Sequence, residues 1–472
     1  MTDKKSPAKD DSVWGGPTKR LFVSMLTRDI ELSDAILDLI DNCVDGAMRL
    51  QRDHLEEDTP FRGFSANLSI NKQSFELSDN CGGIPDEFID DAFSLGRPNI
   101  KKDGDIPTIG MYGIGMKRAI FKMGSESIVT SNSEESFFSV NYSSKWLDPE
   151  NDDDWYLPIS KAQKKDSKKG VTISVTQLKE DVARKFHSET FIDYLKKEIS
   201  QHFGYIMLKG FTIFVNDDQI EPKTLSVFSN ADQLDKTINP YDFEVTINDV
   251  KVKVVVGFYR PLVKEEEIEI EEERSTGPDS SGISVICNDR VILLADRSAK
   301  TGWGDGSVPK YHPQFSAIAG LITFYSNDAD KLPISTTKRG LEVGSDVYLV
   351  ARNAAMEGIK AFTEFTNKWK GRTEETNSFF QNSKATNAKT TVSLAVTSGR
   401  QVRGLTDSKR FLPNLPMPDN RNPKRRISFL KNEDDIRTLS KYLFEDPGQR
   451  PNLIGEACFD KMLEEAKHHG GK

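Results

Sequence analysis

The sequence predicts an α/β protein of two or three domains, and three observations lead to this class. Helix-like and strand-like patterns alternate from residue 20 to about residue 180. After a turn signal at residues 216–218 the pattern becomes rich in strands, and residues 347–370 carry apolar side chains at helical spacing. The 472 residues are too many for one compact core.

Composition narrows the class of protein. With 36% hydrophobic and 29% charged residues, the chain is typical of soluble globular proteins. No segment approaches the roughly 20 apolar residues that cross a bilayer, and the polar N-terminus lacks a signal peptide, so we expect no membrane association and a cytoplasmic protein. Four widely spaced cysteines fit reduced thiols. The net charge of −9 argues against a generally basic surface but leaves room for a local basic patch.

The first element with chemical character is a helix that contains residues 38–47, behind an expected flexible arm at 1–16. Helical periodicity places Asp38, Asn42 and Asp45 on one face beside an apolar stripe. A carboxylate and a carboxamide one turn apart can therefore point into one cavity. The alternative is an ordinary amphipathic helix with a solvated acidic face.

Two glycine-containing segments follow. Asp79 stands at the end of the strand-like residues 75–78, and Gly82 and Gly83 follow it after two intervening residues. A simple turn between strands would explain this segment equally well. In residues 110–117, three glycines precede a helix start, where backbone amides and the helix dipole favour an anion; the residues concerned are Gly110, Gly113, Gly115 and Lys117. Such glycines also serve close packing. The polar residues 96–109 suit a lid.

The order and spacing of these three segments resemble the ATP site of the GHKL superfamily, which joins DNA gyrase, large heat-shock chaperones, histidine kinases, MutL and MORC ATPases. The resemblance implies a Bergerat-type ATP-binding α/β sandwich with a mixed sheet over residues 17–225, with ATP and Mg²⁺ as ligands. Histidine kinases are disfavoured because no phospho-accepting histidine helix precedes the first motif.

The resemblance also implies roles for individual residues. Asn42 would be the Mg²⁺ ligand and Asp38 the catalytic carboxylate that orients or deprotonates the attacking water. Asp79 would accept a hydrogen bond from adenine. The remaining expected nucleotide-binding residues are Asp45, Gly83, Gly110, Gly113, Gly115, Lys117 and Thr172.

The sequence departs from the family pattern at two of these positions. Asp38 stands where the family has Glu, and Cys81 replaces a glycine. Because Asp is one methylene shorter than Glu, we expect slow turnover unless the backbone lies closer.

A second α/β domain is expected over residues 226–370. Residues 243–258 alternate as two strands around Asn248 and Asp249, a hairpin pattern. Residues 282–293 and 332–342 resemble the transducer domain that gyrase, MutL and MORC proteins attach to their ATPase. In that domain Lys338 would reach the γ-phosphate, with Arg339 as its rival and a surface basic pair as the plain alternative.

The C-terminal part is expected to be a disordered basic linker at 371–426 and a small helical tail at 427–472, with helices near 433–444 and 455–467. The first part of the linker is rich in Ser, Thr and Asn. Nine basic residues lie between 400 and 431, where phosphate contacts would concentrate; a solubilising linker is the alternative.

The matches look most like prokaryotic MORC-like ATPases. This resemblance implies pairing of two subunits on ATP binding, DNA as the client, and an antiphage or restriction-modification context with an operon-encoded partner. Two alternatives stay open. One is a protein-remodelling chaperone, favoured by the acidic charge and the strand-like acidic residues 265–273. The other is a weakly hydrolysing ATP-gated scaffold, favoured by Asp38.

Overall fold

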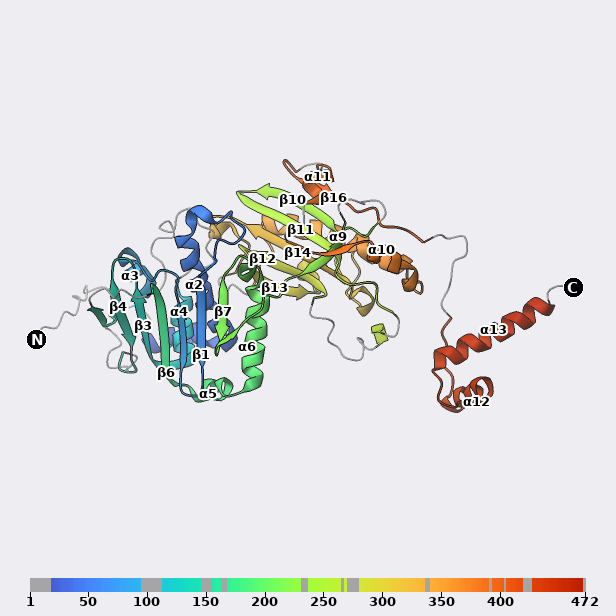
Figure 1. Ribbon diagram of the computed structural model, residues 1–472, viewed down its shortest axis with the longest axis horizontal. Helices are drawn as coiled ribbons and strands as arrows, with labels where there is room; N and C mark the ends of the chain where they lie inside the picture. Colours follow the sequence, from blue (N-terminus) through green and yellow to red (C-terminus); the bar gives the residue numbers. More distant parts are fainter. Residues whose placement is uncertain are drawn as a thin grey trace, which may run out of the picture. The chain divides into compact units, whose positions relative to one another are not determined.

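The computed structural model describes residues 18–94, 113–146, 155–162, 168–230, 237–264, 267–269, 280–335, 340–389, 393–402, 405–418 and 427–469. The chain divides into two compact units, residues 1–418 and residues 419–472. The first unit contains two large sheets, and the second consists of helices (Figure 1).

The first sheet has eight strands in the order β5-β4-β3-β6-β2-β1-β7-β8. It is mixed, because β1 pairs in parallel with β7 while the other neighbours are antiparallel. The expected α/β class with a mixed sheet is therefore confirmed. The strands are β1 Ser65–Ile70, β2 Phe75–Asp79, β3 Gly124–Asn132, β4 Phe137–Tyr142, β5 Ile159–Ala162, β6 Gly170–Leu178, β7 Thr212–Val215 and β8 Asp218–Gln219.

Alternating burial in the strands shows which face of this sheet carries the core. Leu68, Leu77 and Ile173 are buried on one face, whereas Ile128 is 48% exposed on the other. Helices α2 (Leu32–Leu50) and α4 (Gly115–Met123) pack against β1, β3 and β6 (Figure 1). The other helices before β7 are α1 Lys19–Arg28, α3 Ile89–Phe93, α5 Glu180–Phe186, α6 Glu189–His202 and α7 Gly204–Leu208.

The second sheet has six strands in the order β13-β12-β14-β11-β10-β16. Its hairpin β10 (Tyr241–Ile247) to β11 (Val250–Phe258) confirms the prediction from residues 243–258. Asn248 and Asp249 both have positive φ, 51° and 64°, as a type I′ turn requires. The other strands are β12 Gly282–Cys287, β13 Arg290–Asp296, β14 Ile318–Tyr325 and β16 Lys409–Phe411.

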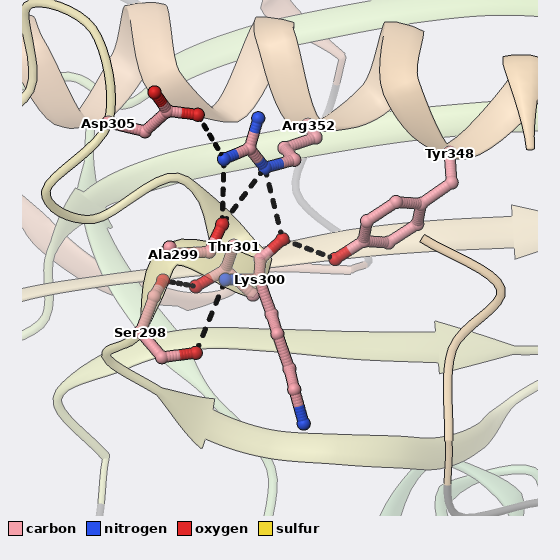
Figure 2. Close-up of polar contacts among 7 residues, drawn as sticks. All are labelled: Ser298, Ala299, Lys300, Thr301, Asp305, Tyr348 and Arg352. Carbon is pink, nitrogen blue, oxygen red and sulfur yellow. Dashed lines mark hydrogen bonds and ion pairs between the residues drawn. The ribbon is translucent and has the colours of Figure 1, made fainter. Parts of the chain in front are cut away.

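The predicted long helix is present as α9 (Asp346–Lys368), which packs on β11 and β14. Its Arg352 and Tyr348 bind the backbone carbonyls of the 3₁₀ helix η5 (Ala299–Thr301), in the connection between β13 and β14 (Figure 2). This irregular connection is thereby fixed to the helix. Of the acidic residues 265–273, only 267–269 are described, and these three are helical rather than extended.

Residues 371–418 differ from the expected disordered linker. They contain η8 Thr373–Thr376, α10 Asn377–Gln381, β15 Lys384–Asn387, α11 Leu394–Ser398 and β16. The short strand β15 pairs with β9 (Ser226–Ser229), and β16 extends the second sheet beside β10. A strand added to an existing edge gains backbone hydrogen bonds without a hydrophobic run of its own. The flexible arm at 1–16 and the basic residues 421–426 lie outside the described residues.

The second unit contains α12 (Glu433–Phe444) and α13 (Pro451–His469), which confirms the two predicted helices. Among the described helices, none combines the length and the apolar character that spanning a bilayer would need.

Candidate nucleotide site

Helix α2 is mostly buried, and before its last turn it is exposed at a single residue. From Leu32 to Met48, Asn42 alone is exposed, while Asp38 and Asp45 on the same face are buried. An amphipathic surface helix would expose a continuous polar stripe instead. This pattern favours the interpretation of Asn42 as a ligand-facing carboxamide over that of a solvated acidic face.

The start of α4 lies against Asp38. A Cβ added to Gly115 would stand 3.5 Å from Oδ2 of Asp38, and Gly113 has a φ of 63°, which favours glycine. The amides that open α4 therefore lie beside the carboxylate of the first motif. The first and third motifs meet, as the sequence predicts.

Lys117 differs from the mobile cation expected at this position. Its side chain is 1% exposed, and its ammonium donates a hydrogen bond to the carbonyl oxygen of Gly113. A lysine in the first turn of a helix can fold back onto the carbonyl four residues earlier. Lys117 therefore fixes the loop that leads into α4, and its role toward a nucleotide stays a prediction.

Asp79 lies at the end of β2, as predicted. Its Oδ1 accepts hydrogen bonds from the amides of Cys81 at 2.8 Å and Val171 at 3.2 Å. Burial raises the pKa of the Asp79 carboxyl above its ordinary value, although these amide donors oppose the shift. Burial, with the neighbouring Asp79 charge, also raises the pKa of the Cys43 and Cys81 thiols. Both thiols are therefore protonated, inert packing groups at neutral pH.

The glycines around Asp79 are required by close packing of the protein backbone. A Cβ on Gly83 would collide with the carbonyl oxygen of Asn132, and one on Gly170 would collide with that of Asp79. In α2, a Cβ on Gly46 would lie 2.9 Å from the carbonyl oxygen of Cys81. These contacts bring α2, the Asp79 segment and the start of β6 together. The sequence analysis did not use Gly46, whose only signal was its position beside the first motif.

The expected role of Thr172 requires correction. Thr172 pairs with Ser78 in β2, and its neighbour Ile173 pairs with Leu77 on the buried face. Because alternate residues of a strand point to opposite faces, Thr172 points to the face opposite Leu77 and Asp79. Val171, whose amide donates to Oδ1 of Asp79, lies beside this carboxylate instead.

Gly110, Lys338 and Arg339, and the whole of the expected lid at 96–109, lie outside the described residues. Within the described part of the chain, no cluster of three or more His, Cys, Asp and Glu side chains could hold a metal. A single exposed amide oxygen fits Mg²⁺, a hard cation that takes oxygen ligands and keeps several waters beside phosphates. The residues present thus suit Mg²⁺ bound together with a nucleotide.

Comparison with known families agrees with this geometry. Residues 30–181 match the family model of histidine kinase-, DNA gyrase B-, and HSP90-like ATPases. This segment is therefore similar to GHKL-type ATPase domains. The match covers α2, the Asp79 segment, α4 and β6, and it supports ATP binding and ATP hydrolysis in general. No curated protein was found to match the chain.

Proposed function

We propose that the protein is a nucleotide-gated, dimerising ATPase of MORC-like type that acts on DNA. The GHKL-type domain supports the ATPase part of this proposal. The β12–β13 hairpin behind it, followed by α9, supports a transducer-like second domain. The single observation that carries the ATPase assignment is the exposure of Asn42 on the otherwise buried helix α2.

Each residue of the proposed site has a separate role in nucleotide binding or hydrolysis. Bound Mg²⁺ supplies charge neutralisation at the phosphates. Asn42 holds the cation through its amide oxygen, and Asp79 accepts a hydrogen bond from the adenine amino group. Asp38 orients a water molecule and accepts its proton. Lys338 reaches the γ-phosphate oxygen in the closed state and stabilises the developing charge.

Substitutions of Asp38 test the hydrolytic role. Asp38→Ala keeps nucleotide affinity and loses turnover, because this carboxylate acts on water rather than on the nucleotide. Asp38→Glu restores the family residue and hydrolyses ATP at least as fast as wild type if the short reach limits the rate. Normal turnover by Asp38→Ala would remove Asp38 from the mechanism. Loss of turnover in Asp38→Glu would mean that the site, with Gly115 so close, is adapted to Asp.

Substitution of Lys338 tests the transducer assignment. Lys338→Ala lowers turnover on the order of 100-fold, the usual cost of removing an electrostatic stabiliser of a transition state. Nucleotide affinity changes little, because the lysine acts only in the closed state. Arg339→Ala is the matched control. Normal turnover by Lys338→Ala would overturn the assignment.

DNA binding and dimerisation are tested with the full chain. A non-hydrolysable ATP analogue shifts the mass of the particle from one subunit to two, and retention on DNA falls steeply with salt as counterions are released. Failure to bind DNA would favour the chaperone, and binding of ATP without turnover would favour the scaffold. The antiphage or restriction-modification context, with an operon-encoded partner, rests on the MORC resemblance and is tested by the neighbouring genes.

A further inference from the structure

The tip of the β12–β13 hairpin reaches helix α2 of the ATPase domain. Asn288 and Asp289 form its two-residue turn, with φ of 45° and 69°, and Arg290 is the first residue of β13. The Nε of Arg290 donates to Oδ1 of Asp41 at 2.8 Å. Asp41 is 0% exposed and Arg290 is 6% exposed, so this ion pair between the two domains is buried.

Two further contacts hold Arg290 in place. Its guanidinium carbon lies 4.1 Å from the ring centroid of Phe203, and its Nη1 donates to the carbonyl oxygen of Val291 at 3.1 Å. The same carbonyl accepts a hydrogen bond from Nδ1 of His202 at 2.6 Å. The planar guanidinium of Arg290 thus stacks on the Phe203 ring and donates to Asp41 at the same time, which a lysine ammonium cannot do.

The adjacent residue of the turn is clamped as well. Asp289 is 1% exposed and forms ion pairs with Lys209, at 2.8 Å, and with Lys389. Lys209 follows α7 of the ATPase domain, and Lys389 follows β15. Because ion pairs fix the turn from two sides, the backbone next to Arg290 is held in place. Arg290 can therefore hold the side chain of Asp41 in one position.

Asp41 belongs to the same face of α2 as the candidate site residues. At 100° per residue, Asp41 stands about 60° from Asp38 and about 100° from Asn42 around the helix axis. Rotation of α2 by a fraction of a turn would break the pair with Arg290 and would also turn Asn42 away from its ligand. A fixed Asp41 therefore fixes the direction of Asn42.

We propose that Arg290 is a positioning residue for Mg²⁺-nucleotide binding, supplied by the second domain and acting through Asp41 on Asn42. This inference rests on the proposed function of α2 as part of the nucleotide site. It assigns Arg290 no contact with the nucleotide. Its effect is on the cation, because Asn42 is the residue whose direction it sets.

The test measures ADP affinity by calorimetry with Mg²⁺ and with chelator, and takes the ratio of the two dissociation constants. Arg290→Lys keeps the positive charge but loses the planar guanidinium and its stacking on Phe203. Asp41→Asn keeps the shape of the Asp41 side chain but removes its negative charge. Each should reduce the Mg²⁺-dependent gain in affinity about 10-fold, as loss of groups that orient a metal ligand usually does. Arg410→Lys is the matched control, because Arg410 pairs with Glu357 at 2.6 Å within the second domain.

The ratio of the two dissociation constants distinguishes a loss of Asn42 positioning from general destabilisation of the protein. A smaller folded fraction, followed by thermal melting, weakens ADP binding equally with and without Mg²⁺ and leaves the ratio unchanged. A reduced ratio in Arg290→Lys and Asp41→Asn, with a wild-type ratio in Arg410→Lys, is the expected result. An unchanged ratio in both site variants would overturn the inference while the proposed function stands. If the wild-type protein bound no ADP in either condition, the proposed function itself would fall.

Discussion

At the scale of single residues, Asp79 has a structural role beside the ligand-binding role proposed for it. Its Oδ1 already accepts two backbone amides, which tie β2 to Cys81 and to the start of β6. Burial raises its pKa, so the folded state binds a proton more tightly than the unfolded chain does. The carboxyl therefore favours the folded state most below its unfolded pKa of about 3.8, and this contribution is lost as pH rises through the folded pKa.

The proposed recognition of adenine by Asp79 should depend on pH in the opposite direction. The ionised carboxylate is the better acceptor for the adenine amino group, so ADP affinity should fall as pH is lowered through the raised pKa of Asp79. Asp79→Asn should bind ADP more weakly at neutral pH, on the order of 10-fold, because a hydrogen bond to a charged group is lost. It should also lose this pH dependence. Calorimetry across the acid range checks both, and an unaltered pH profile in Asp79→Asn would assign the titration to another group.

The sequence predicted which residues lie near the candidate site better than it predicted their burial and strand register. Asp38, Asn42 and Gly115 come together because helical spacing and the glycine before α4 are local properties. Thr172 was misplaced because strand register is set by pairing with β2, which a single sequence does not display. Lys117 was expected to be a mobile cation at the nucleotide, and its burial was not predicted because it depends on the hydrogen bond to the carbonyl oxygen of Gly113.

At the scale of elements, the connection from β13 to β14 depends on helix α9. Arg352 donates from Nε and Nη2 to the carbonyl oxygen of Ala299 at 3.0 and 2.7 Å, and from Nε to that of Lys300 at 3.2 Å (Figure 2). Its Nη2 also donates to Oδ2 of Asp305 at 2.5 Å, and the hydroxyl of Tyr348 donates to the carbonyl oxygen of Lys300 at 2.9 Å. The carbonyl oxygens of Ala299 and Lys300 in η5 thus accept hydrogen bonds from side chains of α9.

Arg352→Ala should therefore destabilise the first unit by about 1–3 kcal/mol, the range for hydrogen bonds made by a charged donor. Urea unfolding measures the change. Arg437→Ala is the control, because Arg437 forms an exposed pair with Glu433 within α12 and should leave the unfolding midpoint almost unchanged. Equal midpoints for Arg352→Ala and wild type would show that η5 needs no support from α9.

Elements with strong local signals were predicted and elements that depend on partners were not. The β10–β11 hairpin follows from alternation around Asn248 and Asp249, and α9 follows from its apolar spacing. Strands β15 and β16 carry little apolar character, because they add to existing sheets by backbone hydrogen bonds. Asp242 then anchors α11 by accepting from the hydroxyl of Ser393 and the amide of Ala395. None of these partners is visible from residues 371–418 alone.

At the scale of the whole molecule, the chain separates after Pro418 into two units. The first unit contains residues 30–181, which match the ATPase family model, so the proposed nucleotide site lies in it. Truncation after Lys370 would remove β15 and β16 from this unit, whereas truncation after Pro418 leaves them in place. The second boundary therefore gives the cleaner test of the DNA proposal.

Truncation after Pro418 removes five of the nine basic residues between 400 and 431, namely Arg421, Lys424, Arg425, Arg426 and Lys431. DNA affinity at about 100 mM salt should fall and its salt dependence should flatten, since fewer phosphates are neutralised, while ADP affinity survives. Replacing Arg421, Lys424, Arg425 and Arg426 with Gln in the full chain should reproduce the effect. An unchanged salt slope would move the DNA contacts to the first unit.

The central claim is that α2 presents Asn42 to a Mg²⁺-bound nucleotide, and calorimetry of Mg²⁺-ATP with wild type, Asn42→Ala and Asp38→Ala tests it most directly. The account predicts binding by wild type and by Asp38→Ala, because Asp38 acts on water. It predicts no measurable Mg²⁺-ATP binding by Asn42→Ala at an unchanged melting temperature, since Asn42 is exposed and supports no packing. Wild-type Mg²⁺-ATP affinity in Asn42→Ala would contradict it.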